Sequence, residues 1–554
     1  MSLTSSLVGR ALRRALRARA RRLADERFWA RNALDMQREQ LRWLLRRAAR
    51  TRFGQEHDFA RLAQLEGPAL EAAYRQAVPV SDYPRLKPWL DRMFREAEPD
   101  VLWPGLVRDW AQTSGTTAGE KFVPVSREAF AHNRKAALDA VAYAMLRGVD
   151  PAWVFAGKTL VLGGSSSLVV EPNGMRWGDL SGLTTRLMRW PFSTAILPSR
   201  ETSLLGDWSV KLARMARESA QQDVRWLNGM PSWTLKLFDA LVEHARAQGR
   251  DVACVRDVWP NLRVFVHGGV RYDPFEPRVR QAWSGDPAGD DIPVRIEAYA
   301  ASEGFIALQD RAGDPGLRLN LDHRVHYEFA PLEEAQSEAP TALGLDSVET
   351  NRRYALVMST CAGLWRFMLG DVVEFDTLPP QGPPRLRIVG RVRHFMNAFG
   401  EHIIVDNIER AVVAAQRACG LATGEFTAAP VYPRPGESAR LELAVEFESP
   451  PTQGQLLRFA QAFDEALQRE NMDYAAKRRN DTGIAPPRVT PLALGAFHAW
   501  MQAQGKLGGQ HKCPRCANDR SIVDAVVTAA QRLGPSVDGA PRSSTAPSPS
   551  PAPT

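Results

Sequence analysis

The chain has 554 residues, of which 44% are hydrophobic and 24% are charged. This length is too great for one compact core, so we expect at least two domains. The composition is that of a globular protein and excludes a mostly disordered or fibrous chain. No stretch approaches about 18 consecutive apolar residues, so the sequence predicts no transmembrane helix.

Positive charge is concentrated at the start of the chain. The net charge is +8, from 71 Lys and Arg against 63 Asp and Glu, and residues 1–50 alone hold fourteen Arg and four acids. The remainder is close to neutral, which argues against binding of nucleic acid over the whole surface. The five Cys are few and odd in number, and no secretory signal precedes them, which predicts a reducing, cytoplasmic location.

Residues 8–50 have a helical pattern, with Leu12, Leu16 and Leu23 recurring among Ala and Arg. One interpretation is a helix for an anionic surface or for targeting, because no acid occurs before Asp25. We favour a solvated helical segment packed on the main domain, because the apolar pattern continues into the body of the chain from Trp29 onward.

Strand-like and helical stretches alternate over residues 100–400, which predicts an α/β body. Strands are expected at 159–162, 262–266, 294–298 and 354–358. Helices are expected at 127–146, 203–220 and 232–247. Gly- and Pro-rich turns interrupt this pattern at 163–182 and 377–384.

A Pro-rich segment at 379–384 marks a break before the last part of the chain. Helices at 405–419 and 453–470 and a strand at 441–447 then predict a smaller α+β domain. The end of the chain consists of Pro, Ser, Ala and Thr and lacks the apolar residues needed to fold, which predicts a disordered tail. The predicted division is an Arg-rich helical segment, a large domain, a smaller domain and the tail, at 1–50, 51–390, 391–533 and 534–554.

The strongest local motif is Thr113-Ser-Gly-Thr-Thr-Ala-Gly-Glu-Lys121. Glycines let a backbone approach phosphate oxygens, hydroxyl and N–H groups donate to the anion, and Lys supplies charge. It is not a Walker A loop, because Glu120 separates the glycine from the lysine. We favour a nucleotide-phosphate loop over a flexible surface turn. Its candidate ligands are Thr113, Ser114, Gly115, Thr116, Thr117 and Lys121.

This loop also resembles the signature loop of the acyl-adenylate-forming superfamily, Thr-Ser-Gly-Thr-Thr-Gly-x-Pro-Lys. Ala118 and Glu120 depart from that pattern, and both departures resemble the GH3 family of acyl acid amido synthetases. The resemblance implies a large N-terminal α/β domain of the acyl-adenylate-forming type and a smaller, mobile α+β C-terminal domain. Arg- and Ala-rich, Lys-poor usage favours a bacterial member.

Two further motifs follow in the family's order. The segment 259–270 reads as a strand and a glycine turn, and the resemblance places Gly269 and Val270 against adenine. In the segment 297–304, it places Tyr299 on the adenine. Taken alone, the segment 259–270 is equally well a plain turn at the end of a strand. The resemblance adds Ala300 and Ser302 to the nucleotide site.

Glu303 ends that second motif, and the resemblance implies that its carboxylate holds Mg²⁺ between phosphate oxygens. A single Glu is otherwise more often a solvated surface residue. Further on, in the segment 362–371, the family's Gly-Asp pair implies that Asp371 accepts from the ribose hydroxyls. Arg366 in the same segment is equally well a structural ion pair.

The segment 390–403 resembles the motif at which the two superfamily domains join. This implies that Arg391 reaches the ribose or phosphate and that 392–394 form a hinge; the alternative is a basic strand–turn–strand. Residues 508–520 resemble the C-terminal region of the family, and Lys512 is the best match for the adenylation lysine, ahead of Lys506.

Cys513 and Cys516 are more plausibly incidental thiols than a zinc or redox pair, because no second Cys pair accompanies them. The acyl pocket is expected from 160–182 and 226–233, where Met230 and Trp233 fit either an apolar acid or the core.

The resemblance covers nearly the whole chain, from Thr51 to Arg520, and implies a ligase that uses ATP and Mg²⁺. A carboxylic acid would form an acyl-adenylate and pyrophosphate, and the amine of an amino acid would then displace AMP. Candidates for the base in the second step are Tyr83, His267 and His394. The alternatives are an acyl-CoA ligase with the same first step and a non-catalytic, Arg-rich binding protein of the same fold.

Overall fold

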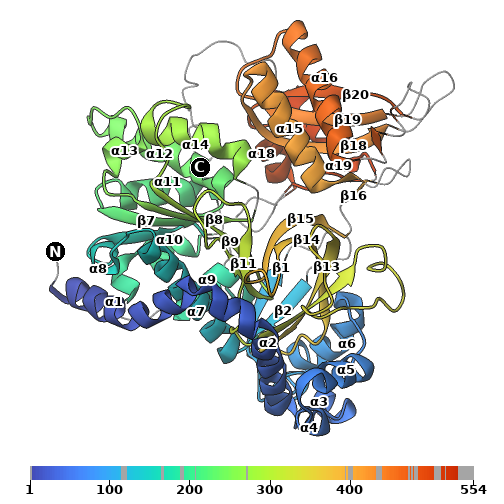
Figure 1. Cartoon of the computed structure of the whole chain (residues 1–554). Coiled ribbons are helices and arrows are strands. Elements are labelled where there is room, and N and C mark those ends of the chain that lie inside the picture. The colour runs from blue at the N-terminus through green and yellow to red at the C-terminus, as the bar shows by residue number, and fades with distance from the viewer. Residues whose placement is uncertain are drawn as a thin grey trace, which may run out of the picture.

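The computed structural model describes residues 3–113, 121–163, 168–187, 192–205, 208–269, 272–392, 395–396, 403–431, 440–471, 474–475, 478, 484–504, 513–517 and 519–533. They form a large α/β body and a smaller α+β unit that contains the C-terminal elements (Figure 1). This is the fold class that the sequence predicts. Among the described residues, every helix is too short or too polar to cross a membrane.

An 11-stranded sheet runs through the large body in the order β12-β13-β14-β15-β11-β10-β9-β8-β7-β3-β6. Strands β6, β3, β7, β8 and β9 pair parallel, whereas every pair from β9 to β12 is antiparallel. The sheet therefore changes character at the β9–β10 hairpin. Its strands are β3 (Lys158–Val161), β6 (Ile196–Leu197), β7 (Val224–Gly229), β8 (Val264–Gly268), β9 (Val294–Ala301), β10 (Gly304–Leu308), β11 (Leu317–Leu319), β12 (Val325–Pro331), β13 (Arg353–Thr360), β14 (Phe367–Thr377) and β15 (Arg385–Arg391).

A second, four-stranded sheet lies in the same body in the order β2-β1-β5-β4. Two of its strands, β4 and β5, fall inside the segment 163–182, for which the sequence predicts turns. Each of them has only two or three residues, which is too short for a strand pattern to be recognised in the sequence. The strands are β1 (Asp109–Thr113), β2 (Lys121–Val125), β4 (Val169–Val170) and β5 (Arg176–Gly178).

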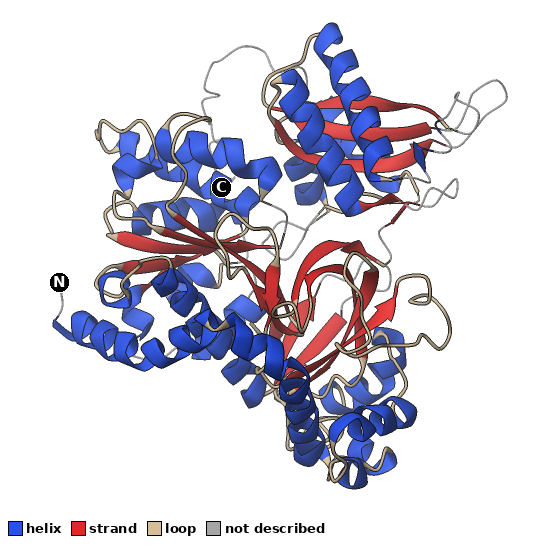
Figure 2. Cartoon of the chain, viewed as in Figure 1, coloured by secondary structure: helices blue, strands red, loops and turns tan. Residues whose placement is uncertain are grey.

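Helices cover both faces of the parallel half of the large sheet (Figure 2). Leu160, Leu227 and Phe265 face one helical layer, and Trp226 and Val264 face the other, as the alternation of side chains along a strand requires. The helices of the body behind the first 100 residues are α7 (Arg127–Leu146), α8 (Pro151–Val154), α9 (Leu180–Leu187), η1 (Phe192–Ala195), α10 (Arg200–Ser203), α11 (Trp208–Ser219), α12 (Pro231–Ala247), α13 (Val255–Val258), η2 (Asp273–Phe275) and α14 (Glu276–Ser284).

The N-terminal segment packs on the body, as the favoured sequence interpretation holds. Helix α1 contacts α7 and α8, and its residues Leu16, Ala20 and Leu23 are buried. The next helices enclose a third core with Trp103, Trp110 and Trp365. The helices are α1 (Leu3–Ala24), α2 (Glu26–Ala48), α3 (Arg52–Glu56), α4 (Phe59–Leu62), α5 (Gly67–Ala77) and α6 (Tyr83–Phe94).

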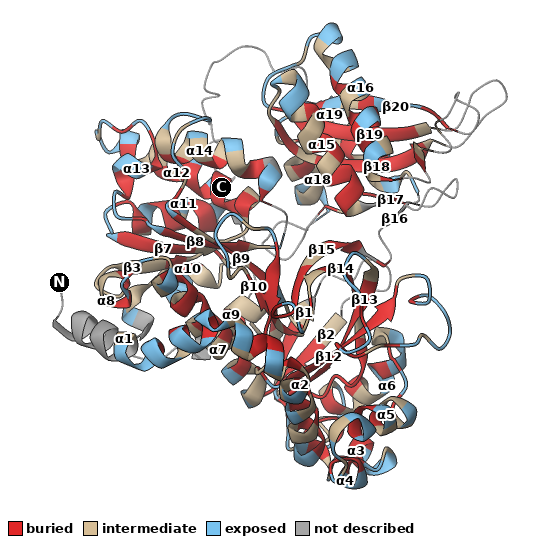
Figure 3. Ribbon diagram, viewed as in Figure 1, coloured by how far each residue is buried: buried red, intermediate tan, exposed pale blue. Residues whose placement is uncertain are grey.

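The C-terminal unit has its own interior, which Figure 3 shows as a separate set of buried residues. A three-stranded sheet, β18-β19-β20, packs against α15 and α16, and a two-stranded sheet, β16-β17, precedes it. Its elements are β16 (Phe395–Met396), β17 (Ile403–Ile404), α15 (Val405–Cys419), β18 (Thr423–Val431), β19 (Arg440–Phe447), α16 (Gln453–Glu470), β20 (Ala485–Ala493), α18 (Ala496–Ala503) and α19 (Ser521–Leu533).

The Pro-rich segment 379–384 connects β14 to β15, which are paired neighbours in the large sheet. The chain therefore turns back there within the body, and it leaves the sheet only after β15. The predicted hinge residues 393–394 and the predicted tail 534–554 lie outside the described residues.

Candidate active site

A cavity of about 1310 Å³ lies between the large body and the C-terminal unit. The carboxyl ends of β8 and β9, the β9–β10 hairpin and strands β14 and β15 line it from the body, and α15 lines it from the other side. Ligands of open α/β sheets bind outside the carboxyl ends of the strands, where the strand order or direction switches. The parallel half of this sheet ends at β9, so the cavity stands at such a point.

Many of the residues that the sequence singles out line this one cavity, although they come from distant segments. They are Lys121, Gly269, Tyr299, Ala300, Ser302, Glu303 and Asp371. Others lie outside the described residues: Ser114, Gly115, Thr116, Thr117, Val270 and Lys512. Thr113 and Arg391 end strands β1 and β15, and their side chains are also outside the described part.

The phosphate motif connects two paired strands. Thr113 at the end of β1 lies opposite Lys121 at the start of β2, so the loop leaves and re-enters one antiparallel pair. The Lys121 ammonium lies 5.4 Å from the ring centre of Tyr83. The Phe122 N–H donates to the Tyr83 hydroxyl at 3.0 Å. Tyr83 therefore holds the strand that presents Lys121 to the cavity.

The glycine turn after β8 has two steric causes. A Cβ on Gly268 would stand 2.2 Å from the carbonyl oxygen of Ala298 on the neighbouring strand β9. Gly269 has a φ of +86°, which L side chains rarely adopt. The pair of glycines thus brings the backbone of β8 close to β9 and then turns it away along the cavity wall.

Tyr299 and Asp371 contact each other inside the cavity wall. The Tyr299 hydroxyl donates to the Asp371 carboxylate at 2.7 Å, and both residues are buried. Asp371 lies on β14 opposite Arg391 of β15. The hydrogen bond fixes the ring of Tyr299 and one oxygen of Asp371 relative to each other, which suits a nucleoside that must reach both.

Glu303 lies on a two-residue turn. Ala301 of β9 pairs with Gly304 of β10, so Ser302 and Glu303 alone connect the strands. A turn this short fixes the direction of its side chains. The Glu303 carboxylate at the cavity fits Mg²⁺ as an oxygen ligand, and the Lys121 ammonium in the same lining fits the charge of a polyphosphate.

Two of the candidate bases are poorly tuned for that role. Burial lowers the pKa of His267 to about 3, and its ring packs 4.7 Å from Tyr272. Burial also raises the pKa of Tyr83. A general base works best with a pKa near the operating pH, which neither group has. His394 lies outside the described residues.

Other side chains that the sequence singles out have structural roles. Arg366 is a buried ion-pair partner, because its guanidinium donates to both oxygens of Glu328 at 2.8 and 3.1 Å. Trp233 is buried in the core around α12, and with Met230 it lines a second cavity of about 90 Å³. Within the described residues, 160–182 and 226–233 do not line the large cavity. Cys513 and Cys516 are buried thiols.

Profiles of three protein-family domains match the chain in order. The GH3 family N-terminal domain matches residues 26–198, the GH3 family central domain 319–391 and the GH3 family C-terminal domain 406–521. Together these matches cover more than half of the chain. The chain belongs to the GH3 family.

Curated GH3 relatives are distant. Indole-3-acetic acid-amido synthetase GH3.3 of Arabidopsis thaliana is 24% identical over 286 residues, 49% of this chain and 46% of that protein. The synthetase GH3.8 of Oryza sativa subsp. indica is 27% identical over 307 residues, 51% of this chain and 48% of that protein. The chain thus spans about half the length of these relatives.

Solved structures show the same fold over 92% of the chain. The GH3.15 acyl acid amido synthetase in complex with 2,4-DB superposes with a TM-score of 0.72 at 16% identity and covers 92% of this chain and 95% of that one. A 2-hydroxyisobutyryl-CoA ligase in the postadenylation state has a TM-score of 0.57 at 15% identity, over 92% and 94%. The fold of this chain is therefore shared by a GH3 amido synthetase and by a CoA ligase.

The GH3 motifs do not include all residues at the cavity. Asp406, Glu409 and Arg410 of α15 and Arg515 line it from the C-terminal unit. Sequence reasoning missed them because they reach the cavity only through the docking of one unit on the other. The regular apolar pattern of 405–419 predicts α15 but not which body its polar face meets.

Proposed function

We propose that this chain is an ATP-dependent acyl acid amido synthetase, which adenylates a carboxylic acid and transfers the acyl group to the amine of an amino acid. The observation that carries the proposal is that Lys121, Tyr299, Glu303 and Asp371 line one cavity. The family motifs give these four residues separate parts of one nucleotide. The curated relatives with amido synthetase names support the same reaction class.

In the first step, a carboxylate oxygen of the acid attacks the α-phosphorus of ATP. The new P–O bond forms as the bond to the β-phosphate oxygen breaks, and pyrophosphate leaves. Both reactants are anions, so the site must offset their repulsion by preorganised positive charge. Lys121, the loop donors Ser114 to Thr117 and Lys512 would supply it, and Mg²⁺ held by Glu303 would neutralise phosphate charge when bound.

The nucleoside would lie along the cavity wall formed by β8 and β9. Gly269 and Val270 would contact one face of the adenine and Tyr299 would stack on it, with Ala300 and Ser302 beside it. Asp371 would accept hydrogen bonds from the ribose hydroxyls, and Arg391 would reach the ribose or the phosphate. The Tyr299–Asp371 hydrogen bond keeps these two contacts in a fixed relation.

In the second step, the neutral amine attacks the acyl carbonyl carbon. A C–N bond forms, the C–O bond to AMP breaks and the amine loses one proton. Water would hydrolyse the same mixed anhydride, so the site has to close before the amine enters. We infer that the C-terminal unit, residues 391–533, reorients about 392–394 relative to the large domain 51–390 between the two steps.

The remaining expectations from the sequence belong to the same proposal. We expect a cytoplasmic, bacterial enzyme with ATP, a small carboxylic acid and an amino acid as its reactants and Mg²⁺ as its metal. No nucleic acid takes part in this chemistry. We keep residues 1–50 as a separate N-terminal segment on the large domain, and the predicted tail 534–554 lies outside the described residues.

The test measures pyrophosphate and AMP release from ATP and Mg²⁺ over a panel of carboxylic acids, with and without pooled amino acids. Acid-dependent release that amino acids accelerate, with an amide found by mass spectrometry, is the expected result. If CoA accelerates the release and amino acids do not, the protein is an acyl-CoA ligase instead.

Glu303→Gln should abolish the release, because an amide is a weaker ligand for Mg²⁺. Glu243→Gln, an exposed change of the same kind on α12, serves as the control and should leave the release unchanged. Absence of release from the wild type with every acid would contradict the proposal.

A further inference from the structure

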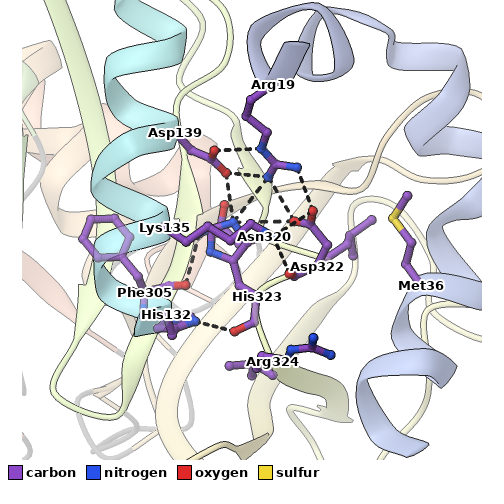
Figure 4. A network of polar contacts seen from close by, with 12 residues as sticks. Arg19, Met36, His132, Lys135, Asp139, Phe305, Asn320, Asp322, His323 and Arg324 are labelled. Carbon is purple, nitrogen blue, oxygen red and sulfur yellow. Dashed lines mark hydrogen bonds and ion pairs between the residues drawn. The ribbon is translucent and has the colours of Figure 1, made fainter. Parts of the chain in front are cut away.

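Helix α1 precedes the region in which the family profiles match, and one of its arginines is bound to two carboxylates of the large body (Figure 4). The Arg19 guanidinium donates to both oxygens of Asp139, at 2.8 and 2.6 Å. It also donates to both oxygens of Asp322, at 2.7 and 3.0 Å. One side chain therefore joins α1 to α7 and to the loop before β12.

These carboxylates also bind a buried histidine and a lysine. His323 Nε2 lies 2.9 Å from Asp139 Oδ2, and the Lys135 ammonium lies 2.9 Å from Asp322 Oδ2. Asp139, Asp322 and His323 are close enough together to resemble a metal site. The guanidinium and the ammonium already supply the positive charge that two carboxylates require, so the cluster is an ion-pair network.

The network continues to the hairpin of the candidate active site. The backbone carbonyl of His323 accepts from His132 Nδ1 at 2.6 Å. On the other side of the ring, the Phe305 N–H donates to His132 Nε2 at 2.6 Å. A carbonyl can only accept and an N–H can only donate, so these two partners fix His132 as the neutral ring with its proton on Nδ1.

Phe305 is the second residue of β10, and Glu303 lies two residues before it on the turn. Asn320 Nδ2 donates to the Phe305 carbonyl at 3.1 Å, so both backbone groups of Phe305 are bound from outside the hairpin. A Cβ on Gly304 would lie 3.3 Å from His132 Nε2, which shows how closely the ring approaches the turn. The position of His132 therefore fixes the position of the turn.

We propose that Arg19 is a positioning residue for the Glu303 turn: it holds the loop of His323, and through His132 it fixes the start of β10. As far as it concerns Mg²⁺·ATP, this inference rests on the proposed function. The guanidinium is well suited to the task, because its planar fork binds two carboxylates at once, which an ammonium group does not match. The Arg-rich helix thus acts on the site through residues that do not line the cavity.

The first experiment is carried out on the protein without nucleotide and needs no substrate. Hydrogen exchange of the Phe305 amide, followed by mass spectrometry of peptides from β10, is compared in wild type, Arg19→Met and Arg17→Met. Arg17 is exposed on the same helix, so its variant loses the same charge without touching the network. We expect exchange about tenfold faster in Arg19→Met and unchanged in Arg17→Met.

The second experiment uses the same variants in pyrophosphate release. Arg19→Met should raise the KM for Mg²⁺·ATP about tenfold while the KM for the acid stays within about twofold. Arg19→Lys keeps a charge but loses the double fork, so we expect an intermediate effect. It also provides a folded variant if Arg19→Met does not accumulate.

The outcomes separate the two proposals. If wild type releases no pyrophosphate, the proposed function fails, and the exchange of the Phe305 amide still decides whether Arg19 positions the turn. If wild type is active and both Arg19 variants match Arg17→Met in exchange and in KM, the positioning role is overturned. A general loss of stability would raise exchange throughout the body rather than in β10 first, and this pattern would also overturn it.

Discussion

At the scale of single residues, Tyr299 and Asp371 give the candidate site its most direct test. Asp371→Asn keeps the shape but removes the charge that would bind the ribose hydroxyls. Hydrogen bonds to a charged group contribute about 1.5–3 kcal/mol, so we expect the KM for ATP to rise roughly 10- to 100-fold. Tyr299→Phe loses only the hydroxyl that orients the carboxylate, and its effect should be smaller.

Nucleotide binding to both variants can be measured by calorimetry, and the acid substrate provides an internal control. An unchanged affinity for ATP in Asp371→Asn would exclude the carboxylate from the nucleoside site.

His267 allows a prediction about pH. Burial lowers its pKa from 6.5 to about 3, so the folded chain binds fewer protons than the unfolded chain between these values. The free energy of unfolding therefore decreases as the pH falls through this interval. His267→Phe should reduce that slope by up to about 1.4 kcal/mol per pH unit. Its buried Nδ1 has no hydrogen-bond partner among the described residues, so the substitution breaks no described hydrogen bond of that nitrogen.

Urea unfolding between pH 4 and pH 7 measures the slope. Equal slopes for wild type and His267→Phe would show that the imidazole titrates normally in the folded protein.

At the scale of elements, the approach of β8 to β9 shapes the wall on which the adenine would lie. Gly268→Ala puts a methyl group against the Ala298 carbonyl, where only 2.2 Å is available, so the strands must separate. We expect a lower free energy of unfolding, in the range of about 1–3 kcal/mol for an overpacked site, and a raised KM for ATP. Gly454→Ala is the matched control, because a Cβ there meets nothing within 4 Å.

Thermal unfolding and ATP kinetics of both glycine variants check this. If Gly268→Ala has the same unfolding temperature and the same KM for ATP as the wild type, the methyl group is accommodated and the close approach of β8 to β9 does not require glycine.

Several elements could be predicted from the sequence because their signals are local. Helices α7, α15 and α16 begin and end where the sequence predicts. Ser126 accepts from the Ala129 N–H, and Thr452 forms a capping box with Gln455. The first turns of α7 and α16 are therefore determined by residues close in the sequence. The motifs of the candidate site are local in the same way.

What could not be predicted depends on contacts between distant residues. Arg19 and Asp322 lie 303 positions apart, and their pairing depends on how α1 crosses the body. The Pro-rich segment 379–384 shows the same limit, because its composition predicts a turn but not that both flanking strands belong to one sheet. Both contacts depend on tertiary packing, which the local pattern of a single sequence does not predict.

At the scale of the whole molecule, an ion pair and apolar contacts between described residues join the C-terminal unit to the body in this arrangement. Arg278 of α14 pairs with Glu448 at 2.7 Å. The rings of Trp233 and His498 lie 6.1 Å apart, and Met501 packs against the core around α12. The Arg278–Glu448 pair is partly exposed, and such pairs contribute about 0–1 kcal/mol. This is weak enough to break and re-form during a reaction cycle.

If the unit reorients between adenylation and amide formation, the Arg278–Glu448 pair favours the arrangement that contains it. Arg278→Glu places two like charges together, so it should shift the population toward other arrangements. We expect the rates of the two half-reactions to change in opposite directions by up to about fivefold, since the pair contributes about 1 kcal/mol at most. The double variant Arg278→Glu with Glu448→Arg should restore both rates. Pyrophosphate–ATP exchange measures the first step, and amide formation from a preformed acyl-adenylate measures the second. An equal decrease in both rates would contradict a change of arrangement and would indicate a common loss of structure at the interface.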